Sequence, residues 1–508
     1  MLAFASAWPG RAASLLSNPG LESSQTLVGW NAYGGNAYTI TSPSLAHSGT
    51  NYFKVYQSFS GAVNYTGIYQ DYISGAGAVY SANGWAYTSS SDTVAGQNVA
   101  WIEIAFRDAS ANILALYRSA MIATNIVASG AFPKNTWVNL SVTNQYNPNT
   151  LQITNSAKTL VAPVGTYFVR YQVVFQGDAN YSGGSLYFDD LTLTQTGGAP
   201  YGNWNIIWSD EFNSSSINPN IWTYDTGAGG WGNSELEYYT SRLQNAFQAG
   251  GLLHIAARQE SYNGQNYTSA RLKTQGLFSC KYGRLEWRAK LPLGKGFWPA
   301  LWLLGTNITT VNWPGCGEID VVENRGSQPN TVQGSLHSGS DETAVYNLPD
   351  NGSVADFHTY TLDWSTNAIL FYVDGHLYQS QSIWSSSVGA YPAPFNQPFF
   401  IIMNIAVGGQ YLGNPSQSDI NTNTVFPGEM QVDYVRLMSP TAPLTLSISA
   451  TNSSLLLNWP SNIICHLQAQ VAPVSAGLQT NWSDLSATQS PMLIQPTGQS
   501  AFYRLSSP

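Results

Sequence analysis

Apolar and polar residues alternate along most of the chain, in short runs that Gly, Asn, Ser and Pro interrupt. A period of two with frequent turn residues is typical of β-strands that turn one face to a core. Patterns with the helical period are scarce. The sequence therefore predicts an all-β protein, with clear strands at residues 252–258 (LLHIAAR), 284–291, 361–365, 369–375 and 430–438.

Two stretches have the composition of linkers. Residues 194–204 (TQTGGAPYGNW) are Gly-rich, residues 438–445 (MSPTAPLT) are Pro-rich, and each follows a predicted strand. We therefore expect three β domains, at residues 16–198, 199–440 and 441–508. No internal repeat relates them.

Charge is sparse along the chain. Charged residues make up 9% of the sequence and the net charge is −9, with no cluster of Lys or Arg. This argues against a nucleic-acid partner, because such binding depends on neutralising phosphates. No apolar run approaches the roughly 20 residues that span a membrane. Residues 1–15 hold a short apolar stretch and an Ala-Ser-Ala, which we interpret as the remnant of a secretion signal, so we expect a secreted monomer.

Three carboxylates stand close together in the strand-like run EIDVVE, residues 318–323. Side chains alternate faces along a strand, so Glu318 and Asp320 share one face. Glu323 follows Glu318 by an odd offset and would fall on the opposite face. One extra residue, a β-bulge after Asp320, would bring it back to the same face.

Close carboxylates repel one another, so they persist only where they share protons or meet a ligand. Retaining glycoside hydrolysis needs such a set, with one carboxylate as nucleophile and a protonated one as acid. The spacing alone also fits the outer face of a surface strand, or a cation site.

The flanking sequence narrows these alternatives. The runs WSDEFN (208–213), WGNSELEYYT (231–240) and YGRLEWRAKLPLGKGFWPALWLLG (282–305) precede the acids, and WPGCGEIDVVEN (313–324) contains them. Together they resemble the laminarinase-like branch of glycoside hydrolase family sixteen over about 240 residues. The resemblance implies a β-jelly roll with a cleft across its concave sheet, and hydrolysis without a cofactor. Matched to the family motif, Glu318 is the nucleophile, Asp320 the electrostatic helper and Glu323 the general acid/base.

The same resemblance implies a set of sugar contacts around the acids. Trp298 and Trp302 lie four residues apart in a predicted strand and should face one side. The full set of predicted contacts is Trp313, Trp298, Trp302, His337, Asn233, Arg271 and Asn404. Arg271 could equally hold a loop through a salt bridge. A structural Ca²⁺ is implied at Glu211, Gly251 and Asp433, since oxygen ligands suit that ion.

The outer segments carry weaker signals. Residues 16–198 resemble carbohydrate-binding β-sandwich modules of the family-four and family-nine type, with Trp30, Trp85 and Tyr56 as candidate stacking residues, at least one of which we expect to be a core residue instead. Residues 441–508 resemble a small immunoglobulin-like domain, and no chemistry is evident in them.

The sequence therefore predicts a secreted endo-β-glucanase that acts on β-1,3-glucan or on mixed-linkage β-1,3-1,4-glucan. One alternative is the same mechanism on agar, carrageenan or a related polysaccharide. A second is a glucan-recognition protein without activity, although such proteins usually lose the acids.

Overall fold

The chain was examined in a computed structural model. It describes residues 14–23, 27–123, 132–156, 158–198, 204–349, 351–386 and 388–440, and in shorter pieces 446–451, 454–458, 466–471, 482–485, 492–494 and 501–506. Two compact units result, Met1–Ser439 and Pro440–Pro508. Within the described residues there is one α-helix, α1 (Gln417–Asn423), so the predicted all-β class is confirmed.

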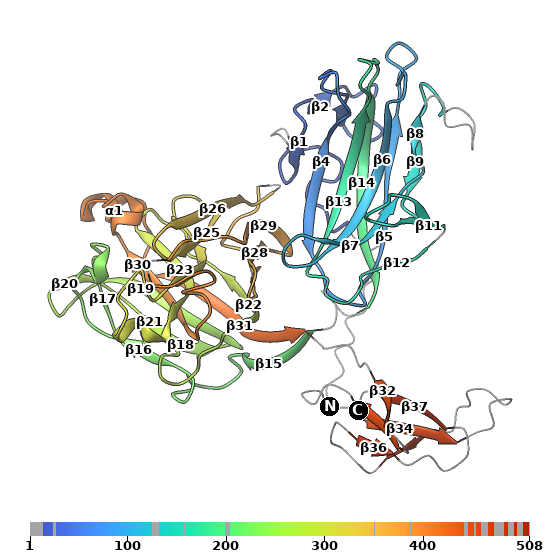
Figure 1. The fold of residues 1–508 in the computed structure, drawn as a ribbon. Coiled ribbons are helices and arrows are strands. Elements are labelled where there is room, and N and C mark those ends of the chain that lie inside the picture. The colour runs from blue at the N-terminus through green and yellow to red at the C-terminus, as the bar shows by residue number, and fades with distance from the viewer. Residues whose placement is uncertain are drawn as a thin grey trace. The chain divides into compact units, whose positions relative to one another are not determined.

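The first unit begins with a sandwich of two sheets (Figure 1). One sheet contains β1 (Asn31–Tyr33), β4 (Asn64–Ile73), β6 (Val99–Arg107), β7 (Ile113–Arg118), β8 (Ile122–Ala123), β10 (Asn144–Tyr146), β11 (Ile153–Asn155) and β13 (Phe168–Gly177). The other contains β2 (Ala37–Thr41), β3 (Asn51–Val55), β5 (Val79–Tyr87), β9 (Val138–Ser141), β12 (Leu160–Val161) and β14 (Leu186–Gly197). Fully buried side chains such as Phe53, Ile102, Val173 and Phe188 form the core between them.

A second sandwich follows, and one of its sheets carries the predicted acids. This sheet has seven strands in the order β16 (Thr223–Asp225), β21 (Arg271–Lys273), β30 (Phe399–Val407), β23 (Phe297–Gly305), β24 (Glu318–Glu323), β25 (Thr331–His337), β26 (Asp341–Asn347). Every pairing in it is antiparallel.

Further strands cover the inner face of the seven-stranded sheet. They are β15 (Trp204–Asp210), β17 (Glu237–Tyr239), β18 (Ala246–Ala249), β19 (Leu252–Tyr262), β20 (Gln265–Ser269), β22 (Gly283–Lys290), β27 (His358–Trp364), β28 (Ile369–Val373), β29 (His376–Gln381) and β31 (Gly428–Pro440). The shared core includes Trp287, Leu362 and Val435 on this side and Leu303, Ile319 and Ile401 on the other.

Local sequence explains one of the turns well. β28 and β29 form a hairpin that closes at Asp374-Gly375, where both residues have positive φ, 49° and 81°. Such a turn suits the right-handed twist of paired strands, and Gly accepts positive φ without steric cost. The Asp-Gly pair that ends the predicted strand at residues 369–375 is therefore the turn of a hairpin.

The second unit, Pro440–Pro508, is a small β domain. Its described strands form two sheets of three, β32-β33-β36 and β35-β34-β37. Their bounds are β32 (Ser447–Thr451), β33 (Ser454–Asn458), β34 (His466–Val471), β35 (Ser483–Asp484), β36 (Met492–Ile494) and β37 (Ala501–Ser506). Leu457 and Leu467 are the buried centre of its core.

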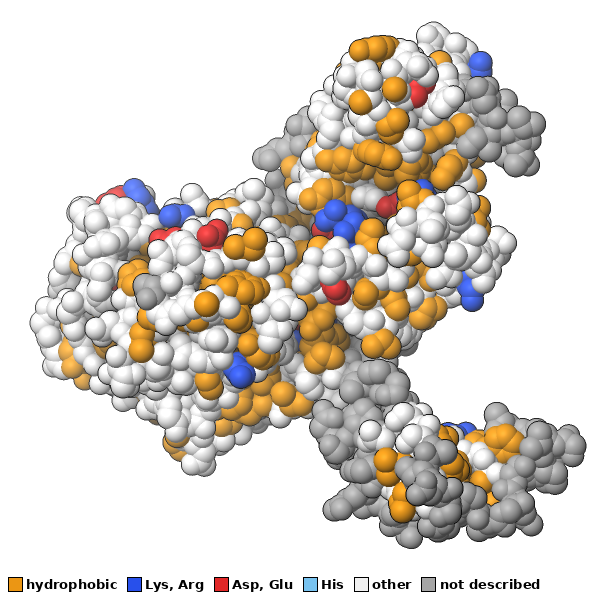
Figure 2. All heavy atoms as spheres, in the orientation of Figure 1, with side chains coloured by type: hydrophobic (Ala, Val, Ile, Leu, Met, Phe, Trp, Pro, Cys, Tyr) orange, Lys and Arg blue, Asp and Glu red, His pale blue; other side chains and the backbone are white. Residues whose placement is uncertain are grey.

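Charged side chains are few on the face shown in Figure 2, as the composition predicts. Among the residues that the structure describes, none of the helices has the length and apolarity that crossing a membrane would demand. The predicted signal remnant, residues 1–15, lies almost wholly outside the described residues.

Candidate active site

The three acids lie on β24, and the strand carries the predicted bulge. Against β25, Asp320 pairs with Ser335 and Glu323 with Gln333, so three steps along β24 match two along its partner. The register against β23 shifts at the same place. The extra residue returns Glu323 to the face of Glu318 and Asp320. All three acids line one cleft of about 400 Å³.

Glu323 is held by three polar side chains. The indole Nε1 of Trp298 donates to its Oε1 at 3.1 Å, and Gln333 Nε2 donates to its Oε2 at 3.2 Å. Ser335 Oγ also donates to Oε2, at 3.5 Å. The carboxyl is 8% exposed. Burial, and then the charge of Asp320, raise the pKa of Glu323 to about 8, so this acid retains its proton at neutral pH.

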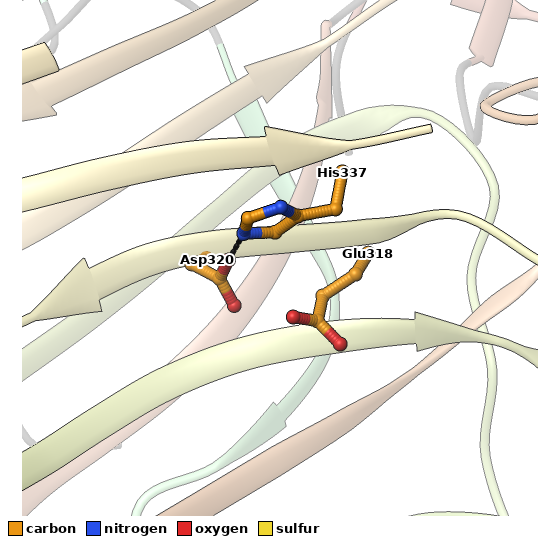
Figure 3. A group of neighbouring side chains, drawn as sticks. All are labelled: Glu318, Asp320 and His337. Atoms are coloured by element: carbon orange, nitrogen blue, oxygen red, sulfur yellow. Dashed lines mark ion pairs between the residues drawn. The ribbon is translucent and has the colours of Figure 1, made fainter. Parts of the chain in front are cut away.

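Asp320 and Glu318 lie beside His337, which comes from the neighbouring strand β25 (Figure 3). His337 Nε2 is 3.1 Å from Asp320 Oδ2, and its Nδ1 is 2.7 Å from Asp341 Oδ1. Burial alone would lower the pKa of His337, but the bond and charge of Asp320 outweigh it and raise that pKa to about 10. The imidazole is therefore a cation between acids.

The charge of Glu318 depends on opposing influences. Burial, followed by the Asp320 carboxylate, raises the pKa of Glu318 well above its ordinary value. His337 and Arg271 act in the opposite direction, because positive charge favours the ionised acid. Burial thus favours the protonated form of both acids and His337 favours the ionised form of both, while Arg271 adds a further influence toward the ionised form of Glu318.

Glu318, Asp320 and His337 also offer three ligand atoms within 4.8 Å of one another, as a metal site would. A histidine binds a metal through a neutral ring nitrogen. His337 is protonated and engaged at both nitrogens, so it has no lone pair to offer at neutral pH. A metal ion would therefore have to displace the ring proton of His337 before it could bind at this group.

The predicted sugar contacts gather around the same cleft. Six of the seven line it: Trp298, Trp302, Trp313, Asn233, Arg271 and Asn404. The seventh, His337, is not a lining residue but contacts Asp320, which is one. Its ring is 5.8 Å from that of Trp313. Trp298 and Trp302 face the same side, as their spacing predicted. The ring of Trp313 is 53% exposed and therefore open to a ligand.

Arg271 forms a salt bridge and also lines the cleft, so its two proposed roles do not exclude each other. Its Nε is 3.0 Å from Asp225 Oδ2, which ties it to β16. Its guanidinium also lies 4.7 Å from the ring of Trp302 and 5.2 Å from that of Trp231. The salt bridge holds the arginine where it lines the cleft.

Sequence reasoning did not identify several residues of this site. Gln333 and Ser335 share strand parity with His337, so the period of two could have placed them beside the acids. Tyr411 was hidden because it follows β30, distant in sequence, yet its ring stacks 4.8 Å from that of Trp298. These three residues stand next to the lining, and the lining residues that were not predicted are Trp231, Gly232, Glu235, Ala300, Leu304, Ile308 and Ala406.

The residues predicted to bind Ca²⁺ have protein partners. Glu211 forms a two-pronged pair with Arg436, at 2.8 and 2.9 Å, and Asp433 pairs with Arg288 at 2.5 Å. Gly251 has positive φ and lies close to Asn213. Oxygen ligands suit Ca²⁺, but both carboxylates are already neutralised by a guanidinium. The calcium site stays a prediction.

Two of the three stacking candidates of the first sandwich, Trp30 and Trp85, have partners within the protein. Trp30 is 7% exposed, and its Nε1 donates to Asn18 O, so it is a core residue and not a stacking one, as expected for at least one of the three. Trp85 stacks on His47 at 3.9 Å between ring centres. Tyr56 is half-buried beside the exposed ring of Tyr38. Side-chain burial could not be read from the sequence around them.

Comparison with known proteins agrees with the geometry of the cleft. The family model described as glycosyl hydrolases family 16 matches residues 233–436. The chain is 42% identical over 252 residues to a beta-glucanase of Rhodothermus marinus, a match that covers 46% of this chain and 85% of that protein.

Two further similarities extend the comparison. A glucan endo-1,3-beta-glucosidase A1 of Niallia circulans is 37% identical over 302 residues, covering 54% of this chain and 43% of that protein. The laminarinase catalytic domain of Thermotoga maritima MSB8 is 41% identical, covering 47% of this chain and all of that domain, with a TM-score of 0.43.

Proposed function

The chain belongs to glycosyl hydrolase family 16, and we propose that it is a retaining endo-β-glucanase that cleaves β-1,3-glucan or mixed-linkage β-1,3-1,4-glucan. Its beta-glucanase and glucan endo-1,3-beta-glucosidase relatives support this substrate class. The observation that carries the proposal is the bulge in β24, which brings Glu318 and Glu323 to one face of the strand and into one cleft.

In the first step Glu318 attacks the anomeric carbon of the bound sugar. Glu323 gives its proton to the glycosidic oxygen as the bond to the leaving sugar breaks. A covalent glycosyl-enzyme forms and the leaving sugar departs as a neutral alcohol. His337 and Arg271 stabilise the ionised Glu318 before attack.

In the second step Glu323, now ionised, removes a proton from a water molecule that attacks the same carbon. The bond to Glu318 breaks, and both carboxyl groups return to their starting states. Two inversions give net retention, so the β-anomer is released first. Asp320 stays paired with His337 and holds the pKa of Glu323 high.

A panel of polysaccharides tests the substrate. We expect reducing ends to be released from laminarin, curdlan and lichenan, and none from agarose. Cleavage of agarose alone would favour the galactan alternative. The absence of activity on every substrate, from folded protein, would favour a glucan-recognition protein.

We further propose that the protein is a secreted monomer, because a glucan polymer is cut outside the cell, and that the first sandwich binds polysaccharide. Supporting the latter, a second hollow of about 400 Å³ lies over β4, β6 and β13. Its aromatic lining consists of Tyr33, Tyr65, Tyr69 and Trp101.

Each arginine that lines this hollow is paired with an acid, either Glu103 of the lining or Asp71 beside it. Arg118 Nε donates to Glu103 Oε2 at 2.7 Å, and Arg170 pairs with Asp71 at 2.6 Å. Rings that can stack, beside polar groups without net charge, suit a neutral sugar chain rather than an anionic one. Neither Trp30, Trp85 nor Tyr56 lines the hollow.

A further inference from the structure

Two additional glutamates lie at the edge of the cleft, and the reaction uses neither. Glu237 on β17 has no exposed surface, and Glu235 is 7% exposed. The backbone N–H of Val407 donates to Glu237 Oε2 at 2.6 Å, whereas Oε1 has no partner among the described residues. A buried carboxylate with an unsatisfied oxygen is costly, so this group calls for an explanation.

Glu235 stands two residues before Glu237, and the two carboxyl groups interact with each other. Burial, and then the charge of Glu235, raise the pKa of Glu237 well above its ordinary value. Two adjacent buried carboxylates cannot both stay ionised at low cost. A proton on Glu237 can be donated to Glu235, and this bond would satisfy the buried pair.

Glu235 connects the pair to the cleft through Tyr239. The phenol donates to Glu235 Oε2 at 2.9 Å, so its oxygen is free to accept from Asn404 Nδ2 at 3.0 Å. On the far side, Trp302 Nε1 donates to Asn404 Oδ1 at 2.8 Å. An indole N–H can only donate, so Trp302 requires the amide oxygen of Asn404 on its side. Tyr239 requires the amide nitrogen on the other side, and the two hydrogen bonds therefore fix the same orientation of the Asn404 amide.

We propose that Glu235 and Glu237 share one proton and, acting through Tyr239, fix the Asn404 amide as a positioning device for the hydroxyl groups of the sugar bound beside Glu318. Asn404 and Trp302 line the cleft together with Glu318. One N–H of the amide is used by Tyr239, and the other is left for the ligand. This inference rests on the proposed glucanase function for its substrate.

A fixed amide matters because sugar hydroxyls both donate and accept. An amide that could flip would accept either hydroxyl pattern, whereas a fixed one favours a single arrangement. Sites that place polar groups rigidly discriminate strongly between substrates that differ in a hydroxyl. Glu235 and Glu237 would therefore set specificity without contacting the reacting atoms.

Kinetics test the chain of hydrogen bonds. Glu237→Gln keeps a donor toward Glu235 and an acceptor for Val407, so kcat/KM on laminarin should stay within about twofold. Glu237→Leu has neither, and kcat/KM should fall by about tenfold, the loss expected for a disordered hydrogen-bond array. Asn404→Ala should produce a similar loss, and adding Glu237→Leu to it should lower kcat/KM no further.

Glu286→Gln is the matched control. Glu286 is a buried glutamate whose oxygens accept from Thr361 and Tyr434, and it does not line the cleft. Its replacement should leave kcat/KM unchanged. Additive losses for Asn404→Ala and Glu237→Leu would overturn the positioning role, and so would a large loss for Glu237→Gln with an unchanged melting temperature.

Infrared spectroscopy of ¹³C-glutamate-labelled protein tests the shared proton without any substrate. In a Glu323→Gln background at neutral pH, adding Glu237→Gln should remove one protonated-carboxyl band. Loss of a carboxylate band instead would overturn the shared proton, even if Glu237→Leu fails to fold. If the wild type cleaves no glucan, the proposed function fails, and the infrared result still decides whether the proton is shared.

Discussion

His337 Nε2 lies 3.1 Å from Asp320 Oδ2, while its Nδ1 lies 2.7 Å from Asp341 Oδ1. A cation is thereby fixed in the middle of an acidic site. It lowers the pKa of Glu318 and of Glu323, in opposition to burial. Its removal should therefore change the pH range of activity as well as the rate.

Replacement of His337 by Gln should move the acidic limb of the kcat/KM profile to higher pH by about one unit. The reason is the sign of the lost charge, since without the imidazolium Glu318 holds its proton to a higher pH and is ionised later. The measurement is kcat/KM on laminarin across the pH range. An acidic limb that stays in place, or moves to lower pH, would show that His337 does not act on the nucleophile.

Wild-type activity on glucan should fall as the pH rises through about 8, because Glu323 then loses the proton that the leaving sugar needs. On an aryl glycoside with a good leaving group, the formation of the glycosyl-enzyme should lose this alkaline limb. Pre-steady-state release of the phenol measures that step. An identical alkaline limb on both substrates would assign the titration to another group.

The hollow of the first sandwich should govern binding to insoluble glucan. Replacing both Tyr65 and Tyr69 by Ala in the full chain should weaken pull-down on curdlan by roughly tenfold or more, since each ring removes a stacking surface. Hydrolysis of soluble laminarin should be unchanged. The control is Tyr181→Ala, a ring of the same sandwich that is 61% exposed and lies outside the hollow. Equal pull-down of both variants would mean that glucan binds elsewhere.

Calcium, if it binds at Glu211, Gly251 and Asp433, should stabilise the fold without changing the chemistry. Saturating Ca²⁺ at about a hundred times its Kd adds about 2.7 kcal/mol, so the melting temperature should drop when EDTA is added. Asp433→Asn should abolish the difference. Equal melting temperatures with Ca²⁺ and with EDTA would leave Glu211 and Asp433 as partners of arginine only.

Features that depend on neighbouring residues could be predicted from the sequence, and features that join residues far apart along the chain could not. The β24 bulge was predictable because parity along one strand dictates where Glu323 points. The link from Glu235 through Tyr239 to Asn404 was not, because it joins β17 to β30 across more than 160 residues. The sequence could not tell which of Trp30, Trp85 and Tyr56 is the core residue, because nothing in the local sequence separates a core ring from an exposed one.

The central claim is that Glu318 and Glu323 have different chemical roles on one face of β24. Added azide separates them most directly. Where Glu323 is missing, azide attacks the glycosyl-enzyme without needing a base, and where Glu318 is missing, it takes the place of the nucleophile. Both variants should first lose activity on glucan, by about 10²–10⁴-fold for Glu323→Ala. With an activated aryl glycoside and azide, Glu323→Ala should give the β-glycosyl azide and Glu318→Ala the α-glycosyl azide, both resolved by NMR. The same anomer from both variants would contradict the assignment.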